Sequence, residues 1–330
     1  MKQRNRRRAK TYFGVCAFLH SVYTMKRDII SVIDMESDLT KLIDRAIKIK
    51  RDLKRDKQHK VLKNKVLGMV FEKPSLRTRI SFEVGMTQLG GKAIYISPTE
   101  IQIGKRESVY DVAKVMSRFV DCIMYRAFDN KIMVELARHA DVPVINGLDN
   151  LEHPCQILAD LQTIKEHKKK LPGLKLAWIG DGNNVCNSLL LGTAICGMDM
   201  TVACPPGYEP TEAILKQARR ISKKNGTAIV ITSDIKAAAK GADVLVTDTW
   251  VSMGDEAEKA KREAAFKNFQ INDTVLGWAD KDAIVMHCLP AHRGQEITDS
   301  VMDSKHSVVF DEAENRLHAQ KAILEAVMSE

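Results

Sequence analysis

The sequence Phe-Glu-Lys-Pro-Ser-Leu-Arg-Thr-Arg at residues 71–79 follows directly on the apolar run Val-Leu-Gly-Met-Val at residues 66–70. This pattern predicts a buried strand that ends near Pro74 and a helix that begins at Ser75. The first N–H groups of such a helix have no partner within it, and here they would lie beside hydroxyl and guanidinium side chains. We interpret the stretch as a receptacle for a phosphate group; the alternative is a capped, solvated helix start with surface arginines.

Length and composition indicate a globular protein of two domains. The 330 residues are too many for one ordinary core. Hydrophobic residues make up 45% of the chain and charged residues 28%, and no apolar run reaches the roughly 18 residues that a membrane-spanning helix needs. The seven cysteines are scattered and form no Cys-x-x-Cys pair, which argues against a disulfide framework or a zinc knuckle and favours a reducing compartment.

The positive charge is concentrated at the start of the chain. The net charge is +9, but residues 2–10 supply six basic side chains and residues 1–24 contain no acid, so the chain from Met25 onward carries only +3. Residues 1–24 have three interpretations: an upstream start before an initiator at Met25, a targeting segment, or a basic tail. We favour the first, and with it a cytoplasmic protein; a targeting segment would imply the mitochondrial matrix. A nucleic-acid-binding function would depend on residues 2–10 alone.

Hydrophobic periodicity predicts an α/β fold. Expected strands cover residues 66–70, 93–96, 120–125, 142–145, 175–179, 200–203, 227–232, 244–246, 284–287 and 308–310. Expected helices cover residues 37–53, 75–89, 108–118, 131–140, 153–167, 185–196 and 211–224, with a short helix before Gly241 and a final helix from about Asn315. This alternation indicates two tandem doubly wound parallel-sheet domains, in which ligands bind beyond the carboxyl ends of the strands.

Two further groups of polar residues lie at the ends of predicted strands and helices in the first half of the chain. Arg126 comes directly after the strand at 120–125, so Arg77 and Arg126 together can hold a phosphate dianion from two sides. A lone arginine after a strand is usually a surface salt bridge, so the interpretation depends on the pair. His153 and Gln156 lie one turn apart at a helix start and can reach one small polar group; the alternative is a helix cap with a solvated histidine.

The segment Gly-Asp-Gly-Asn-Asn at residues 180–184 lies between a strand and a helix and resembles a dinucleotide fingerprint. It fails at two points, because Val185 stands where the third glycine belongs and residues 200–204 offer no ribose-binding acid. We therefore expect no nicotinamide cofactor, which leaves Asn184 available for another role.

The second half places an acid and a thiol just after strands. Asp248 can pair with an ammonium group, while Ser252 and its backbone can hold a carboxylate. The adjacent His287 and Cys288 suggest a nucleophilic pair. Neighbouring strand residues point to opposite faces, however, so His287 is badly placed to activate Cys288 and we do not expect covalent catalysis.

Six motifs together resemble those of the aspartate/ornithine carbamoyltransferase family, in particular its ornithine members. They are the stretch at 71–79, His-Pro-Cys-Gln at 153–156, Asp-Gly-Asn-Asn at 181–184, Asp-Thr-Trp-Val-Ser-Met-Gly at 248–254, His-Cys-Leu-Pro at 287–290 and Glu-Asn-Arg at 314–316. The resemblance runs from about Met25 to the C-terminus. Each motif alone is weak, but all six in the family's order are specific.

The resemblance implies two adjoining substrate sites. Carbamoyl phosphate would contact Ser75, Leu76, Arg77, Thr78, Gln102, Arg126, His153, Gln156, Cys288, Leu289 and Arg316, with Gln102 reaching in from a neighbouring subunit. Ornithine would contact Asn184, Asp248, Ser252 and Met253. The implied catalytic residues are Arg126, His153, Asp248, Cys288 and Arg316. The Ser-Met-Gly segment separates ornithine enzymes from aspartate ones; an acceptor such as putrescine is a second possibility.

The implied reaction is attack by the neutral δ-amine of ornithine on carbamoyl phosphate, which gives citrulline and phosphate in arginine biosynthesis, a urea-cycle-type step or arginine breakdown. Amines of this kind titrate near about 10.4, so the site must select or generate the neutral form. We expect no cofactor, no metal, and neither nucleic acid nor membrane as a partner. A site completed by a neighbour's Gln102 requires a homo-oligomer, and the resemblance implies a trimer or an assembly of trimers.

The same resemblance divides the chain into four parts: an extension at 1–24, a carbamoyl phosphate-binding domain at 25–165, an ornithine-binding domain at 166–312, and a C-terminal helix at 313–330 that returns to the first domain. One position departs from the family, which usually has threonine where this chain has Leu76. The backbone N–H remains, but a hydroxyl contact is lost, so we expect somewhat weaker binding of carbamoyl phosphate.

Overall fold

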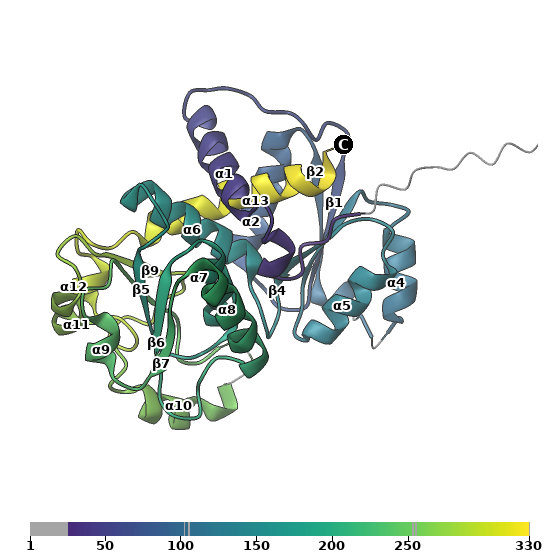
Figure 1. Ribbon diagram of the computed structural model, residues 1–330. Coiled ribbons are helices and arrows are strands. Elements are labelled where there is room, and N and C mark those ends of the chain that lie inside the picture. Colours follow the sequence, from purple (N-terminus) through teal and green to yellow (C-terminus); the bar gives the residue numbers. More distant parts are fainter. Residues whose placement is uncertain (1–25, 102, 105, 253, 255, 330) are drawn as a thin grey trace, which may run out of the picture.

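Two parallel sheets, each covered by helices on both faces, form the protein (Figure 1). The computed structural model describes residues 26–101, 103–104, 106–252, 254 and 256–329. The extension at 1–24 therefore lies outside the described residues. Within the described part, no helix is long and apolar enough to cross a membrane.

The first sheet has the strand order β2-β1-β3-β4. Its strands are β1 (Val66–Phe71), β2 (Lys92–Ile96), β3 (Cys122–Arg126) and β4 (Val144–Leu148). Successive residues of β1 face different cores: Met69 packs in a cluster with Phe82 of α2 (Leu76–Leu89), whereas Val70 packs with residues of α4 (Val109–Met116) and α5 (Asn130–His139). This two-sided burial explains why β1 is an almost continuous apolar run.

The second sheet has the strand order β7-β6-β5-β8-β9. Its strands are β5 (Lys175–Ile179), β6 (Asp199–Ala203), β7 (Ile229–Thr232), β8 (Val244–Thr247) and β9 (Ile284–His287). The helices of this half are α7 (Asn184–Ile195), α8 (Glu212–Asn225), α9 (Ile235–Ala239), α10 (Lys259–Phe266), α11 (Asp273–Trp278) and α12 (Asp299–Met302). The short elements η1 (Val32–Met35), α3 (Pro98–Ile101) and η2 (Glu256–Glu258) complete the connections.

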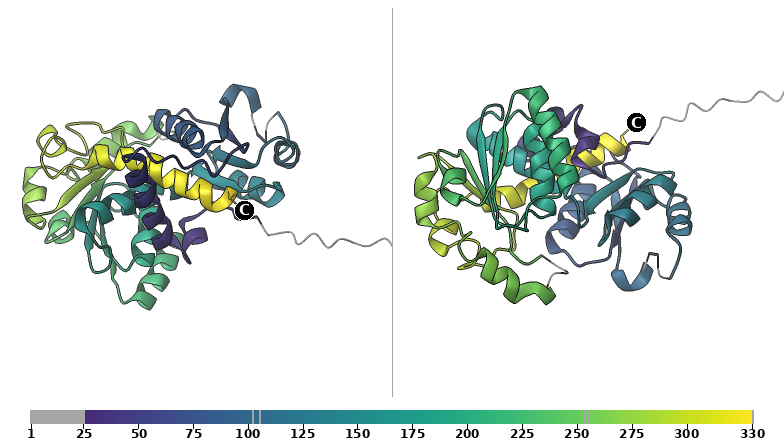
Figure 2. Two further views of the ribbon diagram at one scale, coloured as in Figure 1. Left: turned by 90° about the horizontal axis from the view of Figure 1, so that it is seen from above. Right: turned by 60° about the horizontal axis from the view of Figure 1, so that its bottom comes forward.

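Helices α13 (Val309–Met328) and α6 (Pro154–Lys168) join the two halves. The long helix α13 starts beside β9 and runs back across the first half, where it packs on α6, α1 (Leu39–Leu53) and α2 (Figures 1 and 2). α1 also packs on α6, and α6 packs on α7. The predicted fold, with two doubly wound parallel sheets and a C-terminal helix that packs back on the first, is confirmed.

Each sheet has a point where its strand order reverses direction, between β1 and β3 in the first and between β5 and β8 in the second. Loops on either side of such a point diverge and leave a crevice at the carboxyl ends of the strands. Ser75 and Arg126 lie at the first of these points, and Asn184 and Asp248 at the second. The topology thus places the polar residues singled out in the sequence at the two crevices.

One predicted strand is wrong. Residues 308–310 do not form a strand, because α13 already begins at Val309 rather than near Asn315. Val-Val-Phe has high strand propensity, but Asp311 and Glu312 in the first turn favour a helix start. Pairing at this edge is limited to one bridge between Val285 and Ser307. Most of the other predicted elements shift at their ends by one or two residues; for example, Arg126 ends β3 instead of following it.

The contact between α6 and α7 depends on Gly192. A Cβ atom there would lie 2.6 Å from Ile157 Cγ2 and 3.1 Å from Leu161 Cδ1, both in the buried core. We expect Gly192→Ala to lower the free energy of unfolding by about 1–3 kcal/mol through overpacking. A Cβ atom at Gly277, also in a helix, would meet no atom within 4 Å, so Gly277→Ala should instead be neutral or stabilise by up to about 1 kcal/mol. Equal urea midpoints for the two variants would contradict this.

A candidate active site between the two sheets

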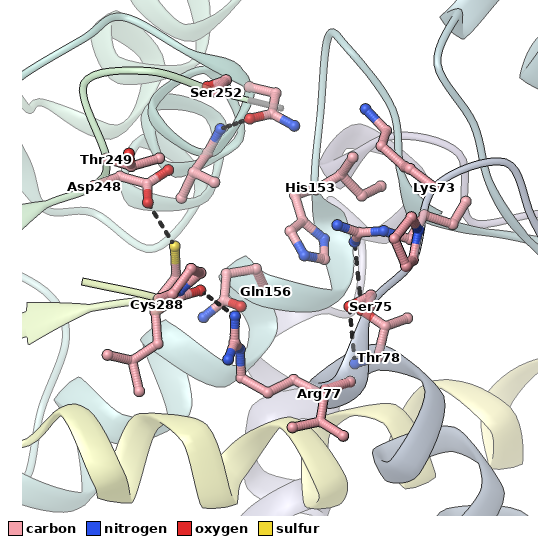
Figure 3. Close-up of a pocket in the computed structure, with 18 of the residues that line it drawn as sticks. Lys73, Ser75, Arg77, Thr78, His153, Gln156, Asp248, Thr249, Ser252 and Cys288 are labelled. Atoms are coloured by element: carbon pink, nitrogen blue, oxygen red, sulfur yellow. Dashed lines mark hydrogen bonds between the residues drawn. The ribbon is translucent and has the colours of Figure 1, made fainter. Parts of the chain in front are cut away.

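A cavity of ≈ 540 Å³ lies between the carboxyl ends of the two sheets. Of the sequence-predicted site residues, the described ones all line it: Ser75, Leu76, Arg77, Thr78, Arg126, His153, Gln156, Asn184, Asp248, Ser252, Cys288, Leu289 and Arg316. Gln102 and Met253 lie outside the described residues. Figure 3 shows Ser75 and Thr78 on one side of this cavity and Asp248 and Thr249 on the other, with His153 and Gln156 between them, while Arg77 extends toward Cys288.

Cationic side chains dominate the wall formed by the first sheet. Ser75 caps α2, since its hydroxyl accepts from the Thr78 backbone N–H at 3.3 Å. The Thr78 hydroxyl in turn lies 3.4 Å from Arg126 Nη1 and 3.3 Å from Arg316 Nη2. Arg77 donates to the Leu289 carbonyl at 2.6 Å. Three guanidinium groups from α2, β3 and α13 therefore converge on one helix start.

Burial makes this convergence electrostatically costly. Arg126 and Arg316 are only 5% and 3% exposed. Loss of solvation, together with the charges of Arg316 and Arg77, lowers the pKa of Arg126 to about 9. The same burial and the nearby guanidinium groups hold the pKa of His153 well below its usual range, so His153 is neutral at physiological pH. An anion with two or three acceptor oxygens would relieve this repulsion.

His153 is not the solvated histidine that the alternative interpretation of the sequence suggested. It occupies the N-cap position of α6, is buried, and its backbone N–H donates to the Ser188 hydroxyl at 2.8 Å. Gln156, one turn later, accepts from Arg316 Nη1 at 2.6 Å through its side-chain oxygen. Both side chains face the cavity between the cationic wall and the second sheet (Figure 3).

The wall formed by the second sheet carries an acid and a thiol in direct contact. The Cys288 thiol donates to Asp248 Oδ1 at 3.1 Å, and Asn183 donates to Asp248 Oδ2 at 2.8 Å. Burial and the Asp248 carboxylate raise the pKa of Cys288 well above its usual range, so it is a thiol at neutral pH. Asn184 also lines the cavity and donates to the Asp149 carbonyl at 2.6 Å.

His287 shapes the turn that carries Cys288. Its Nδ1 accepts from the Leu289 N–H at 2.9 Å and its Nε2 lies 3.0 Å from Glu296 Oε1, so both ring nitrogens are engaged. Leu289 has a φ of 59°, a conformation that a leucine adopts only under such external constraint. One ligand atom each of Asp248, His287 and Cys288 lies within 4.8 Å of the others. A metal bound there would have to displace one of the two hydrogen bonds of His287.

Several residues of the site were missed from the sequence. Asn183 holds Asp248 and also caps α7 through the Val185 and Cys186 N–H groups. Its position one residue after a glycine and before a helix is a cap signal that pointed to it. Glu296, fully buried beside His287, gave no periodic or motif signal. Lys73, buried in the cavity lining, lies within the motif at 71–79, but no role was assigned to it from the sequence.

Comparison with known proteins agrees with this geometry. Residues 27–166 match the family model "Aspartate/ornithine carbamoyltransferase, carbamoyl-P binding domain" and residues 172–327 match "Aspartate/ornithine carbamoyltransferase, Asp/Orn binding domain". A relative from Thermoplasma acidophilum named "Ornithine carbamoyltransferase, catabolic" is 54% identical over 304 residues, which cover 92% of this chain and 99% of the relative.

A relative from Picrophilus torridus named "Ornithine carbamoyltransferase" is 55% identical over 305 residues, which cover 92% of this chain and 100% of the relative. Among solved structures, the ornithine carbamoyltransferase from Pyrococcus furiosus superposes with a TM-score of 0.89 at 46% identity and covers 92% of this chain and 97% of that one.

The fold and the cavity define an α/β enzyme of two parallel sheets, with a polar site where the crevices of the sheets face each other. Both family models together cover nearly all of the described chain, and the relatives match at more than half identity. The chain belongs to the aspartate/ornithine carbamoyltransferase family.

The state of Cys288 can be tested by alkylation. Because its pKa is raised, partly by Asp248, we expect iodoacetamide at about pH 8 to label Cys288 at least about tenfold more slowly than an exposed thiol. Asp248→Asn removes the negative charge and should speed this labelling several-fold. Mass spectrometry of the peptide, with unfolded protein as the reference, measures both rates. Rapid labelling in the native protein that is unchanged by Asp248→Asn would contradict the assignment.

Proposed function

We propose that the protein transfers the carbamoyl group of carbamoyl phosphate to the δ-amine of L-ornithine, which gives L-citrulline and phosphate. One observation carries the proposal: a buried cluster of guanidinium groups around a helix start faces an Asp248–Cys288 pair across one cavity. The first wall suits a phosphate dianion and the second suits an amine. The names of the relatives and of the matching domain models point to the same two substrates.

In this proposal the first wall binds and activates carbamoyl phosphate. Ser75, Leu76, Arg77 and Thr78 hold the phosphate with the N–H groups of α2, and Arg126 supplies a second guanidinium. These groups stabilise the charge that moves onto the phosphate as the carbon–oxygen bond breaks. A Gln102 from a neighbouring subunit would complete this wall, which is why we propose a homotrimer or an assembly of trimers.

A neutral donor and a cationic donor together bind the carbamoyl group of carbamoyl phosphate. His153 is uncharged and Arg316 is held by Gln156, so the imidazole and the guanidinium can polarise the carbonyl oxygen as it gains charge. The backbone of Cys288 and Leu289, fixed by His287, lies at the same end of the cavity. Together these groups would orient the carbamoyl carbon toward the second wall.

Ornithine would lie along the second wall. Asp248 and the Cys288 thiol position the δ-amine, Asn184 contributes an amide, and Ser252 with Met253 addresses the α-carboxylate. The nitrogen–carbon bond forms as the carbon–oxygen bond to phosphate breaks, and the amine loses one proton. Only the neutral amine can attack, so the rate should rise with pH toward the amine pKa, which is about 10.4 for a free amine.

We further propose that residues 25–165 form the carbamoyl phosphate-binding domain and residues 166–312 the ornithine-binding domain, with residues 313–330 returning to the first.

The direction in which the reaction runs is a separate question. One relative is named catabolic and another carries no such word. Measuring the rate of citrulline synthesis against that of citrulline phosphorolysis with the same preparation decides which direction the protein favours.

The reaction and the division of labour can be tested together. Incubation with carbamoyl phosphate and ornithine should yield citrulline, and a folded protein that gives none would refute the proposal. Arg77→Ala should raise KM for carbamoyl phosphate by at least about tenfold, since a charge-assisted contact is lost. Asp248→Ala should mainly raise KM for ornithine.

Arg79→Ala is a matched control, because Arg79 pairs with Glu83 and Tyr95 and does not line the cavity. Putrescine, which lacks the α-carboxylate, should react more slowly than ornithine if Ser252 and Met253 bind that group. Unchanged ornithine kinetics in Asp248→Ala would refute the assigned role of the second wall.

Leu76 offers a test of the departure from the family pattern. Its side chain is 71% exposed at the first turn of α2. Leu76→Thr adds one hydroxyl near the phosphate and should lower KM for carbamoyl phosphate about two- to tenfold, the range expected for one hydrogen bond. Leu76→Val has a shape similar to that of threonine without the hydroxyl and should show no such gain. Equal kinetics for Leu76→Thr and Leu76→Val would show that the hydroxyl contributes nothing.

A further inference from the structure

Two carboxyl groups lie behind the cavity where α6 and α13 meet. Asp160 and Glu312 are 1% and 0% exposed, and their carboxyl groups lie within hydrogen-bonding reach of each other. Both accept from the same nitrogen, Gln156 Nε2, at 2.8 Å for Asp160 Oδ1 and 3.1 Å for Glu312 Oε1. Two acids this close and this dry do not both ionise, because each carboxylate would meet a like charge without water to screen it.

The neighbouring charged groups also favour a single ionised carboxyl group in the pair. Arg316 of α13 attracts a negative charge on Asp160, whereas Asp248 after β8 repels a charge on either acid. Cys288 after β9 is a neutral thiol and contributes no charge. Burial raises the pKa of both acids, and the neighbouring Asp160 raises the pKa of Glu312 further. One positive neighbour balances one ionised carboxyl, not two.

We propose that Asp160 and Glu312 share a single proton, carried by Asp160, and that the pair acts as a positioning device for Gln156 and Arg316. Arg316 attracts a negative charge toward Asp160, but direct N–H donors hold a carboxylate more firmly and locate the proton. Both oxygens of Glu312 already accept N–H donors, from Gln156 at Oε1 and from the His287 backbone at Oε2, 2.9 Å away. Glu312 is therefore suited to be the carboxylate, and the Asp160 hydroxyl donates to it.

This arrangement fixes which way the Gln156 amide faces. Its nitrogen must point to the acid pair, so its oxygen points to Arg316 Nη1, 2.6 Å away. Arg316 is thereby held with Nη2 3.3 Å from the Thr78 hydroxyl. If Glu312 lost its negative charge or were replaced by an amide, the Gln156 side chain could turn over. The Gln156 N–H group would then face the Arg316 guanidinium in place of the oxygen.

Glu312 also links the two walls of the site. Through Gln156 it is tied to α6, which packs with the first sheet's helices, and through the His287 N–H it is tied to the end of β9 in the second sheet. The acids themselves do not line the cavity. They are positioning residues, and the inference deepens the proposed function by naming what holds its carbonyl-polarising groups in place.

Two matched substitutions separate the roles of the acids. Asp160→Asn keeps an acceptor for Gln156 and a donor for Glu312, so KM for carbamoyl phosphate should stay within about threefold of wild type. In Glu312→Gln only one side-chain atom is still an oxygen, so the new N–H group must face either the Gln156 N–H or the His287 N–H. The KM for carbamoyl phosphate should therefore rise by at least about tenfold. Equal losses in both variants, wild-type kinetics in both, or the reverse order would overturn the proposal.

A second measurement needs neither substrate nor the Glu312 variant. Infrared spectroscopy of the wild-type protein at about pH 8 should show the carbonyl stretch of a buried protonated carboxyl group, and Asp160→Asn should lack it. Absence of that band in the wild type, or its persistence in Asp160→Asn, would refute the shared proton. If the proposed function alone were wrong, the wild type would make no citrulline while the band and its loss in Asp160→Asn remained.

Discussion

The convergence of buried positive charge at the start of α2 is the constraint on which the rest of the site depends. Arg77, Arg126 and Arg316 come from three different elements and repel one another in a poorly solvated space. Each is held by a neutral acceptor, the Leu289 carbonyl, the Thr78 hydroxyl or the Gln156 amide oxygen. A site built in this way is prepared for an anion before the anion arrives, because the unfavourable approach of the cations is completed during folding.

Much of the fold was predictable because local signals agreed with one another. The apolar run at 66–70, Pro74 and the Ser75 cap together define a strand, a turn and a helix start, and the structure has all three. The signals disagreed at residues 308–310, where strand-forming side chains precede two acids. Tertiary packing decided for the helix, since Val309 is buried against the second sheet's helices while Phe310 is 70% exposed. An isolated segment cannot reveal that choice.

Without the family resemblance, the candidate site was predictable only where a polar side chain lies at the end of a predicted strand or at the start of a predicted helix. Arg126 and Asp248 end or follow strands, so the parallel topology brings them to the crevices. The hydrogen-bond partners of the site residues were not predictable, because those contacts join distant parts of the chain. Asn183 reaches Asp248 across 65 positions, and Gln156 reaches Glu312 across 156. Such pairs carry no spacing signal, and a buried acid such as Glu296 looks like any surface glutamate in the sequence.

Helix α13 carries both Glu312 and Arg316 and so links the contacts that each of them makes. Glu312 and Arg316 lie one turn apart on it, so one side chain of α6, Gln156, can meet the acid with its nitrogen and the guanidinium with its oxygen. The same helix begins beside β9 and packs on α1, α2 and α6. A shift of the second sheet relative to the first must therefore move Arg316 relative to Thr78, or break the contact between Glu312 and His287. The position of the wall formed by the second sheet and the alignment of the wall formed by the first are thus mechanically linked through one helix.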